Sequence, residues 1–308
     1  YQHQPTGLEV KKQVSKSLNI WLLHFDYNTI NELQFLNFLQ TQSSIQIAQF
    51  NHLIESRATT PNDGFFPNQW QYINDGSNGG VVDADIDADL AWDITTGGVT
   101  PLGDTIVVAV LDNGIDLNHT DFEGNLWVNH DEIPNNGIDD DSNGYVDDYR
   151  GWNTSFNDDN IIGIGGHGTS VAGIIGAKGN NNIGVTGVNW NVKVMVIKND
   201  FNTNEAAVLA AYSYALDARL KYNQTNGAEG AFVVATNASW GVDMGDPNDA
   251  PLWCGFYDEL GFAGITSCGA TVNGNTNVDE EGDLPTACPS DFLIAVTNMN
   301  RMDNKVTG

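Results

Sequence analysis

The sequence predicts an α/β fold: a mostly parallel sheet with helices on both faces, preceded by a small α+β domain. The first observation is a run of six apolar residues, 106–111, which is typical of a strand buried on both faces of a parallel sheet. The second is the alternation of strand-like and helix-like segments after residue 167, as βαβ units require. The third is the separate pattern of residues 1–57, which have strand and helix periodicities of their own.

Residues 1–57 are predicted to form a β-α-β unit. Its first strand, helix and second strand are expected at 18–25, 31–39 and 45–50. A unit of this size buries little apolar surface by itself. The polar, turn-rich segment 55–64 is expected to be an exposed linker, so we expect two domains, 1–57 and 58–308.

The larger domain is predicted to alternate strands and helices along the chain. A short helix is expected over 84–95, ahead of the strand at 106–111. Further helices are expected over 170–177, over 205–222 and up to residue 263, and further strands over 192–197, 231–236 and 292–297. Ligands bind at the carboxyl ends of the strands in open α/β sheets, so polar residues there are candidates for a site.

Two polar motifs point to such a site. Asp112 directly follows the 106–111 strand and begins an Asp-Asn-Gly segment. A carboxylate at the end of a buried strand is costly to hold without a partner. His167, within a Gly-His-Gly-Thr segment ahead of a helix of small residues, is the candidate partner.

The segments 112–114 and 166–169 together resemble the first two catalytic motifs of the subtilisin-like serine proteases, in the family's Asp-then-His order. The resemblance implies hydrolysis of peptide bonds by an Asp-His-Ser triad, with Asp112 as the orienting acid and His167 as the general base. It also implies that the 1–57 domain is a propeptide and the chain a zymogen. The alternative is an ordinary N-terminal extension packed on the main domain. Cleavage is then expected between about Ser56 and Asp63, in the exposed linker.

The family's nucleophile motif, a Gly-Thr-Ser-Met-Ala-like segment, does not occur in these 308 residues. Ser170 lies three residues after His167 on the same helix, so its hydroxyl faces the wrong way to attack a substrate carbonyl next to that imidazole. Ser290 has neither the glycine nor the helix of the nucleophile motif. We therefore expect the serine on a C-terminal segment of the same protease that is not in this chain. This chain alone should be inactive.

Two further segments resemble the family's substrate-binding parts. Ser239, Trp240 and Gly241 resemble the Ser-x-Gly edge that pairs with an extended peptide. A later run of small residues ends at Asn273, where the family places a side-chain oxyanion donor. Because Val272 replaces the family's usual glycine, Asn275 remains an alternative donor.

Residues 139–148 match the first half of a calcium-binding loop. Oxygen donors stand at the positions that such loops use: Asp139, Asp141, Asn143 and the carbonyl of Tyr145. Arg150 replaces the glutamate that usually completes the set of ligands, so Asp147 or Asp148 would have to complete it. Every donor is a hard oxygen, which favours Ca²⁺ over Zn²⁺. The alternative is a solvated acidic turn.

The family resemblance implies a second calcium site. Asn181, with the carbonyls of Ile183 and Val185, resembles the family's Asn-rich calcium loop. Asp121 lies where the family supplies a carboxylate. The alternative is a polar turn between a helix and a strand.

The chain has three cysteines, and spacing alone does not give their connectivity. The family resemblance makes one disulfide unsurprising, and we expect it between Cys254 and Cys288. Cys268, in a run of small residues, is expected to be a buried free thiol.

Composition limits the remaining function classes. A net charge of −28 argues against a nucleic-acid partner, because there is no basic surface to contact phosphates. No window approaches the length of apolar sequence that spans a membrane. The polar N-terminus shows no signal peptide, so any targeting segment is expected to have been removed, and the family resemblance implies a secreted protein.

The leading hypothesis is a secreted, calcium-stabilised endopeptidase acting on peptide or protein substrates, represented here by its pro-region and the first two-thirds of its catalytic domain. One alternative is a non-catalytic relative that binds peptides or partners. Another is a calcium-binding structural module. A serine at the start of a helix within about 100 residues after Gly308 would favour the enzyme.

Overall fold

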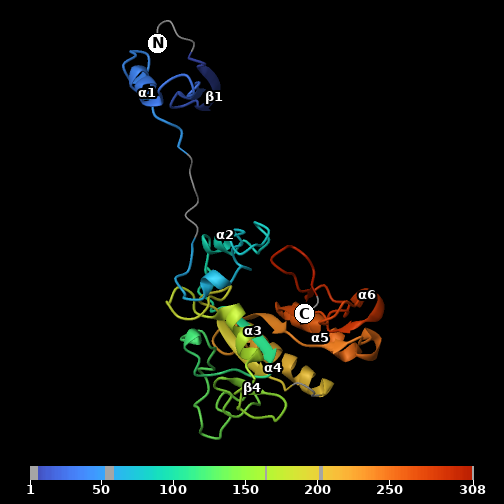
Figure 1. The fold of residues 1–308 in the computed structure, drawn as a ribbon. Coiled ribbons are helices and arrows are strands. Elements are labelled where there is room, and N and C mark those ends of the chain that lie inside the picture. The colour runs from blue at the N-terminus through green and yellow to red at the C-terminus, as the bar shows by residue number, and fades with distance from the viewer. Residues whose placement is uncertain (1–5, 53–58, 164, 201–203, 307–308) are drawn as a thin grey trace. The chain divides into compact units, whose positions relative to one another are not determined.

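The computed structural model describes residues 6–52, 59–163, 165–200 and 204–306. The chain divides into two compact units, residues 1–57 and 58–308 (Figure 1). The expected boundary between Arg57 and Ala58, and Ser56 at the start of the expected cleavage segment, lie outside the described residues. The prediction of an exposed linker over 55–64 is wrong at its C-terminal end, because Pro61 and Asp63 are buried and Asp63 accepts hydrogen bonds from the Asn180 N–H and Thr186 Oγ1.

The N-terminal unit contains an antiparallel strand pair and one helix. β1 (Glu9–Ser15) pairs with β2 (Ile20–His24), and α1 (Glu32–Gln40) follows. The side chain of Asn31 caps α1 by accepting a hydrogen bond from the Gln34 N–H. Among residues 6–52, Ile30 and Phe35 are the apolar side chains that are fully buried.

The prediction of a strand over 45–50 is wrong, because these residues form no regular structure. A strand needs a neighbouring backbone with which to pair, and β1 is the partner of β2. The carbonyl of Ala48 instead accepts a hydrogen bond from the Gln40 side chain, and Ile47 is 77% exposed. The unit is therefore β-β-α rather than β-α-β.

The C-terminal unit is organised around a six-stranded sheet in which every neighbouring pair is parallel, so the predicted mostly parallel α/β fold is confirmed. The strand order is β10-β8-β6-β3-β5-β4. The strands are β3 (Val107–Asp112), β4 (Gly151–Asn153), β5 (Lys193–Lys198), β6 (Val233–Ala238), β8 (Thr266–Ala270) and β10 (Leu293–Val296). A separate antiparallel pair joins β7 (Val242–Asp243) to β9 (Asp283–Leu284).

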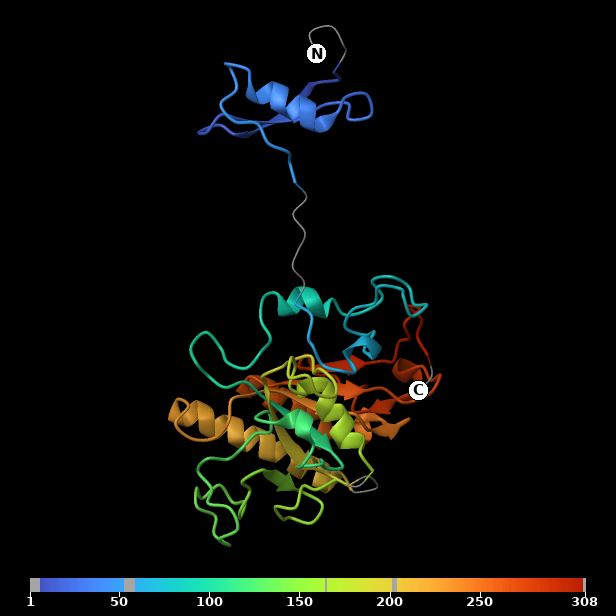
Figure 2. The same cartoon turned by 60° about the vertical axis from the view of Figure 1, so that its left-hand side comes forward.

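Successive side chains of β3 belong to different core clusters, one on each face of the sheet. Val107, Ala109 and Leu111 pack with apolar residues of α4 (Glu205–Thr225) and α5 (Pro251–Ala263). Val110 packs instead with Ala172 of α3 (His167–Gly176). Helices therefore cover both faces of the sheet, and Figure 2 shows α4, drawn in gold, running beside the strands.

The structure shifts several predicted boundaries. α3 begins at His167 itself rather than at residue 170. α2 (Ala88–Trp92) is shorter than the expected 84–95, because Asp87 before it has a left-handed φ of 52°. Short elements complete the unit: η1 (Phe66–Asn68), η2 (Thr120–Phe122), η3 (Pro247–Asp249) and α6 (Val278–Glu281).

The expected disulfide is present. Cys254 of α5 is bonded to Cys288, which follows β9. Cys268 of β8 is a free thiol, half-buried rather than fully buried. None of the helices within the described ranges is long and apolar enough to cross a bilayer.

Candidate active site

Asp112 and His167 are in direct contact. Asp112 is the last residue of β3 and is 1% exposed, and His167 is the first residue of α3. The imidazole Nδ1 lies 2.8 Å from Asp112 Oδ1 and 3.0 Å from Oδ2. A carboxylate accepts hydrogen bonds, so this contact places the proton on Nδ1 and leaves Nε2 as the basic nitrogen.

Residues within the two motifs hold this pair together. The Gly168 N–H donates to the Asn113 side chain at 3.0 Å, and the Asp116 N–H donates to Thr169 Oγ1 at 2.9 Å. Only glycine fits at position 168, because a Cβ there would lie 2.2 Å from the Gly114 carbonyl oxygen. The structure thus adds Asn113 as a positioning residue, and the signal for it was its place inside the Asp-Asn-Gly motif.

The expected substrate edge and oxyanion donor meet in one small pocket. Ser239, Trp240 and Gly241 follow β6, and Asn273 follows β8. All four line a pocket of about 90 Å³. β8, β6 and β3 are neighbours in the sheet, so this pocket lies at the same edge as Asp112. Asn275 is not among the residues that line it.

Trp240 ties this edge to the strand that carries Asp112. Its indole N–H donates to the Leu111 carbonyl at 2.6 Å. The ring also lies against Trp253 of α5, with 6.0 Å between centroids. The position of the expected substrate edge is therefore fixed from both β3 and α5.

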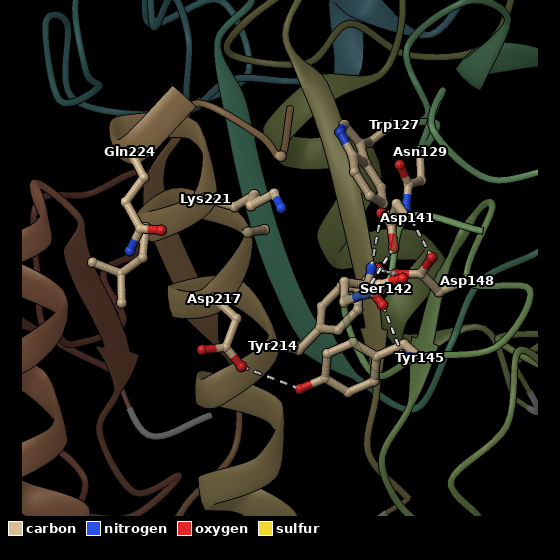
Figure 3. Close-up of a pocket in the computed structure, with 14 residues that line it drawn as sticks. Trp127, Asn129, Asp141, Ser142, Tyr145, Asp148, Tyr214, Asp217, Lys221 and Gln224 are labelled. Atoms are coloured by element: carbon tan, nitrogen blue, oxygen red, sulfur yellow. Dashed lines mark hydrogen bonds between the residues drawn. The ribbon is translucent and has the colours of Figure 1, made fainter. Parts of the chain in front are cut away.

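The acidic loop 139–148 folds against α4 around a cavity of about 290 Å³ (Figure 3). Asp141, Asn143, Tyr145 and Asp148 line this cavity. Asp148 is 1% exposed and accepts hydrogen bonds from Tyr214 Oη and the Asn129 side chain. Burial raises the pKa of the Asp148 carboxyl.

The structure brings Asp139 and Asp141 together with Glu132, which the sequence did not reveal. One ligand atom of each lies within 4.8 Å of the others. Glu132 Oε1 accepts from the N–H groups of Asp140 and Asp141, whereas its buried Oε2 has no hydrogen-bond partner. A buried, unpaired carboxylate oxygen beside two other carboxylates fits a hard cation such as Ca²⁺.

Burial, followed by the charges of Asp148 and Asp141, raises the pKa of Glu132. The sequence could not identify this residue, because it lies outside the spacing of the loop motif.

Asp147 does not join this group. Its carboxylate oxygens accept from the backbone N–H groups of Asn136 and Gly137, each at 2.9 Å. The side chain therefore fixes the turn ahead of the loop.

The second expected calcium loop also folds around a buried carboxylate. Asp121 is 1% exposed and accepts from the Asn181 side chain at 3.3 Å and the Val185 N–H at 2.8 Å. Asn181 Oδ1 in turn accepts from the Ile183 N–H at 2.8 Å. Burial raises the pKa of the Asp121 carboxyl.

Asp63 supports the same loop and was missed by the sequence analysis. It is 3% exposed, and its Oδ2 accepts from the Asn180 N–H at 2.6 Å and from Thr186 Oγ1 at 2.8 Å. No motif marks this residue, because it reaches the loop from a distant part of the sequence.

A parallel α/β sheet in which the buried Asp112 contacts the exposed His167 at the carboxyl ends of the strands has the acid–base arrangement found in hydrolases of the serine-protease type. The subtilase family model matches residues 103–306. The chain belongs to the subtilase family of serine proteases.

Curated relatives carry the same assignment. Subtilisin-like protease 1 of Plasmodium berghei is 34% identical over 170 residues, covering 53% of this chain and 27% of the relative. Subtilisin-like protease 1 of Plasmodium falciparum is 48% identical over 92 residues, covering 30% and 13%. The cell wall-associated protease of Bacillus subtilis is 30% identical over 158 residues, covering 51% and 15%. The matches thus span about a quarter or less of each relative's length.

Among solved structures, a protease from Pseudoalteromonas arctica has the same fold. The TM-score is 0.54 at 24% identity, and the alignment covers 81% of this chain and 68% of that one.

Proposed function

We propose that this chain is the N-terminal part of a secreted, calcium-stabilised serine endopeptidase whose serine lies on another segment of the same protein. The observation that carries the proposal is the 2.8 Å contact between His167 Nδ1 and the buried Asp112 carboxylate. The pocket that contains Asn273 and the 239–241 edge lies at the same edge of the sheet. Membership in the subtilase family supports the same reaction.

In this mechanism Asp112 accepts a hydrogen bond from the Nδ1–H of His167 and orients the imidazole so that Nε2 can take up a proton. Nε2 takes the proton of the serine hydroxyl as its oxygen attacks the substrate carbonyl, and later gives the proton to the leaving amine. The Asn273 amide would donate to the oxyanion, a contribution worth roughly 10²–10³ in turnover in this family. The substrate backbone would pair with the 239–241 edge.

Calcium would be held by Glu132, Asp139 and Asp141, with Asn143, the Tyr145 carbonyl and Asp148 on the same loop. A second ion would be held by Asp121, Asn181 and the carbonyls of Ile183 and Val185. When bound, the ion neutralises carboxylates that otherwise repel one another. Its role in this proposal is to stabilise the loops, and it takes no part in the bond-breaking step.

The N-terminal unit would be a propeptide, released by cleavage between about Ser56 and Asp63. N-terminal sequencing of mature material tests this, and a start before residue 50 would contradict it. Secretion is supported by the Cys254–Cys288 bond, because disulfides persist in oxidising compartments.

The proposed function is tested with the protein that includes its serine-bearing segment. It should hydrolyse peptides, and His167→Ala should lower kcat by about 10⁶-fold, as for loss of a triad member acting with the others. Residues 1–308 alone should show no hydrolysis. Peptide binding without hydrolysis by the longer protein would support the non-catalytic alternative instead.

A further inference from the structure

Three buried polar side chains stand in a row across adjacent strands, beginning with the catalytic carboxylate. Asp112 of β3 pairs in register with Lys198 of β5, and Lys198 pairs with Asn153 of β4. Each is the last residue of its strand, and their exposed fractions are 1%, 6% and 1% in that order. Lysine is almost never buried to this extent unless it is paired, so the charge of Lys198 needs a partner.

The side chain of Lys198 lies on the same face of the sheet as that of Asp112. Side chains alternate between the two faces along a strand. The preceding residues, Leu111 and Ile197, belong to the core cluster on the α4 face. Asp112 and Lys198 therefore point to the opposite, α3 face, where Asp112 meets His167.

Two negative groups are available to this lysine. Among the described residues its ammonium forms a single ion pair, 3.8 Å from Asp200 Oδ1, and the Asp200 side chain is 38% exposed, so water weakens the pair. Asp112 is on the adjacent strand, whose backbone runs about 4.8 Å away. Its carboxylate is buried, and the low dielectric of the interior strengthens the attraction between the two charges.

The other charged groups around His167 are placed differently. α3 packs against β3, β5 and η2. Among the described residues of these elements, Lys198 is the cation at the carboxyl ends of the strands, since Lys193 is at the opposite end of β5. The remaining titratable groups on η2 and on the loops that flank the catalytic pair are five carboxylates and one imidazole: Asp116, His119, Asp121, Glu123, Asp158 and Asp159.

We propose that Lys198 is a positioning residue that acts through Asp112 and extends catalysis to lower pH. The inference rests on the proposed function. The ammonium stabilises the ionised form of Asp112, which has to accept the Nδ1–H hydrogen bond. The same positive charge disfavours a protonated imidazole, so His167 stays neutral and able to accept the serine proton down to a lower pH.

The first test is the pH dependence of kcat/KM in the serine-bearing protein. Lys198→Met removes the charge at a similar side-chain length, and the acid limb should move to higher pH by roughly 0.5–1 unit, as expected for loss of one partly screened charge. Lys198→Arg keeps the charge and should keep the limb in place. A merely structural role would lower kcat/KM by the same factor at every pH.

Lys193→Met is the matched control. Lys193 is the first residue of the strand that Lys198 ends, so the variant removes the same charge from the far edge of the sheet. Its acid limb should coincide with that of the wild-type protein. An unmoved limb in Lys198→Met, or an equal shift in both methionine variants, would overturn the proposal.

The second test does not require catalysis. In residues 1–308, the nitrogen NMR signals of the His167 imidazole report whether the ring is neutral or protonated. Their titration midpoint should rise in Lys198→Met and stay unchanged in Lys198→Arg and Lys193→Met. If Lys198→Met does not fold, Lys198→Gln removes the same charge and serves for the same comparison.

The failures are distinguishable. Equal midpoints in the wild-type protein and in the variants without the Lys198 charge overturn the role of Lys198 and leave the proposed protease intact. If the serine-bearing protein hydrolyses no peptide, the proposed function falls, and with it the effect on catalysis.

Discussion

The proposed catalytic pair, Asp112 and His167, combines a buried acid with an accessible base. The Asp112 side chain is 2% exposed and that of His167 is 45% exposed. Asp112 Oδ1 also accepts the Asn113 N–H at 2.8 Å, so the carboxylate is fixed independently of the imidazole. A buried charge that loses a partner is costly, and this cost keeps the imidazole in one orientation.

Replacing Asp112 by asparagine should therefore affect chemistry rather than binding. The amide keeps the shape but supports the wrong imidazole tautomer, and kcat should fall by about 10⁴-fold with KM little changed. Steady-state kinetics of the serine-bearing protein measure both values, with Asp303→Asn as the control. A raised KM at unchanged kcat would contradict the orienting role.

The cysteines give a prediction that needs no activity. The denatured protein should show one reactive thiol before reduction and three after it, because Cys254 and Cys288 are bonded. Burial raises the pKa of Cys268, so its alkylation in the folded state should be slow at pH 8 and accelerate only above the usual thiol range. Quantitative labelling with iodoacetamide checks both, and three thiols without reduction would contradict the bridge.

Single residues were predictable where a short motif contained them. Asp112 and His167 belong to short motifs that also contain Gly114 and Gly168. Both glycines are required because another part of the backbone lies too close for a Cβ, so each motif was visible in the sequence. Glu132 and Asp63 reach their loops only through the fold, and no local spacing announces them. Asp243 and Asp283 likewise come to stand opposite each other only through the pairing of β7 with β9, which no local sequence pattern announces.

At the scale of elements, the start of α3 depends on close backbone approach. Gly168→Ala should destabilise the protein by about 2 kcal/mol or more, because the added Cβ meets a backbone oxygen that cannot yield easily. The matched control is Gly255→Ala in α5, where no atom lies within 4 Å of the added Cβ. That variant should gain roughly 0.5–1 kcal/mol. Equal Tm values for the two variants would contradict this account.

The acidic loop gives a prediction for metal removal. At a calcium concentration 100 times Kd, binding contributes about 2.7 kcal/mol, so excess EDTA should lower Tm by roughly 5–10 °C. Glu132→Gln should weaken calcium binding by about tenfold or more, because it removes one ligand charge. Calorimetric titration measures the affinity, with the exposed Glu259→Gln as control. An unchanged melting curve in EDTA would argue against both sites.

Elements were predictable in proportion to their length and apolar content. β3, β5 and α4 have long apolar patterns and appear within a few residues of the predicted ranges. β4 has three residues and β8 consists of small side chains, so neither has a strong pattern. The strand predicted over 45–50 was wrong because apolar and polar residues alternate there but no neighbouring strand pairs with them. Local sequence does not specify such pairing.

At the scale of the whole molecule, the two units differ in how much apolar surface they bury. Ile30 and Phe35 are the fully buried apolar side chains among residues 6–52, whereas the larger unit has extensive clusters on both faces of its sheet. A peptide of residues 1–57 should therefore show no cooperative thermal transition, while residues 58–308 should show one. Circular dichroism of the two fragments checks this, and a cooperative transition in the short peptide would contradict it.

The central claim is that the Asp112–His167 pair activates a serine supplied by another segment of the same protein. Fluorophosphonate labelling of the serine-bearing protein tests it most directly, since the reagent reacts with an activated serine hydroxyl. Labelling should occur on one serine after residue 308 and should be lost in His167→Ala. Equal labelling of the wild-type protein and the His167→Ala variant, or none in either, would contradict it.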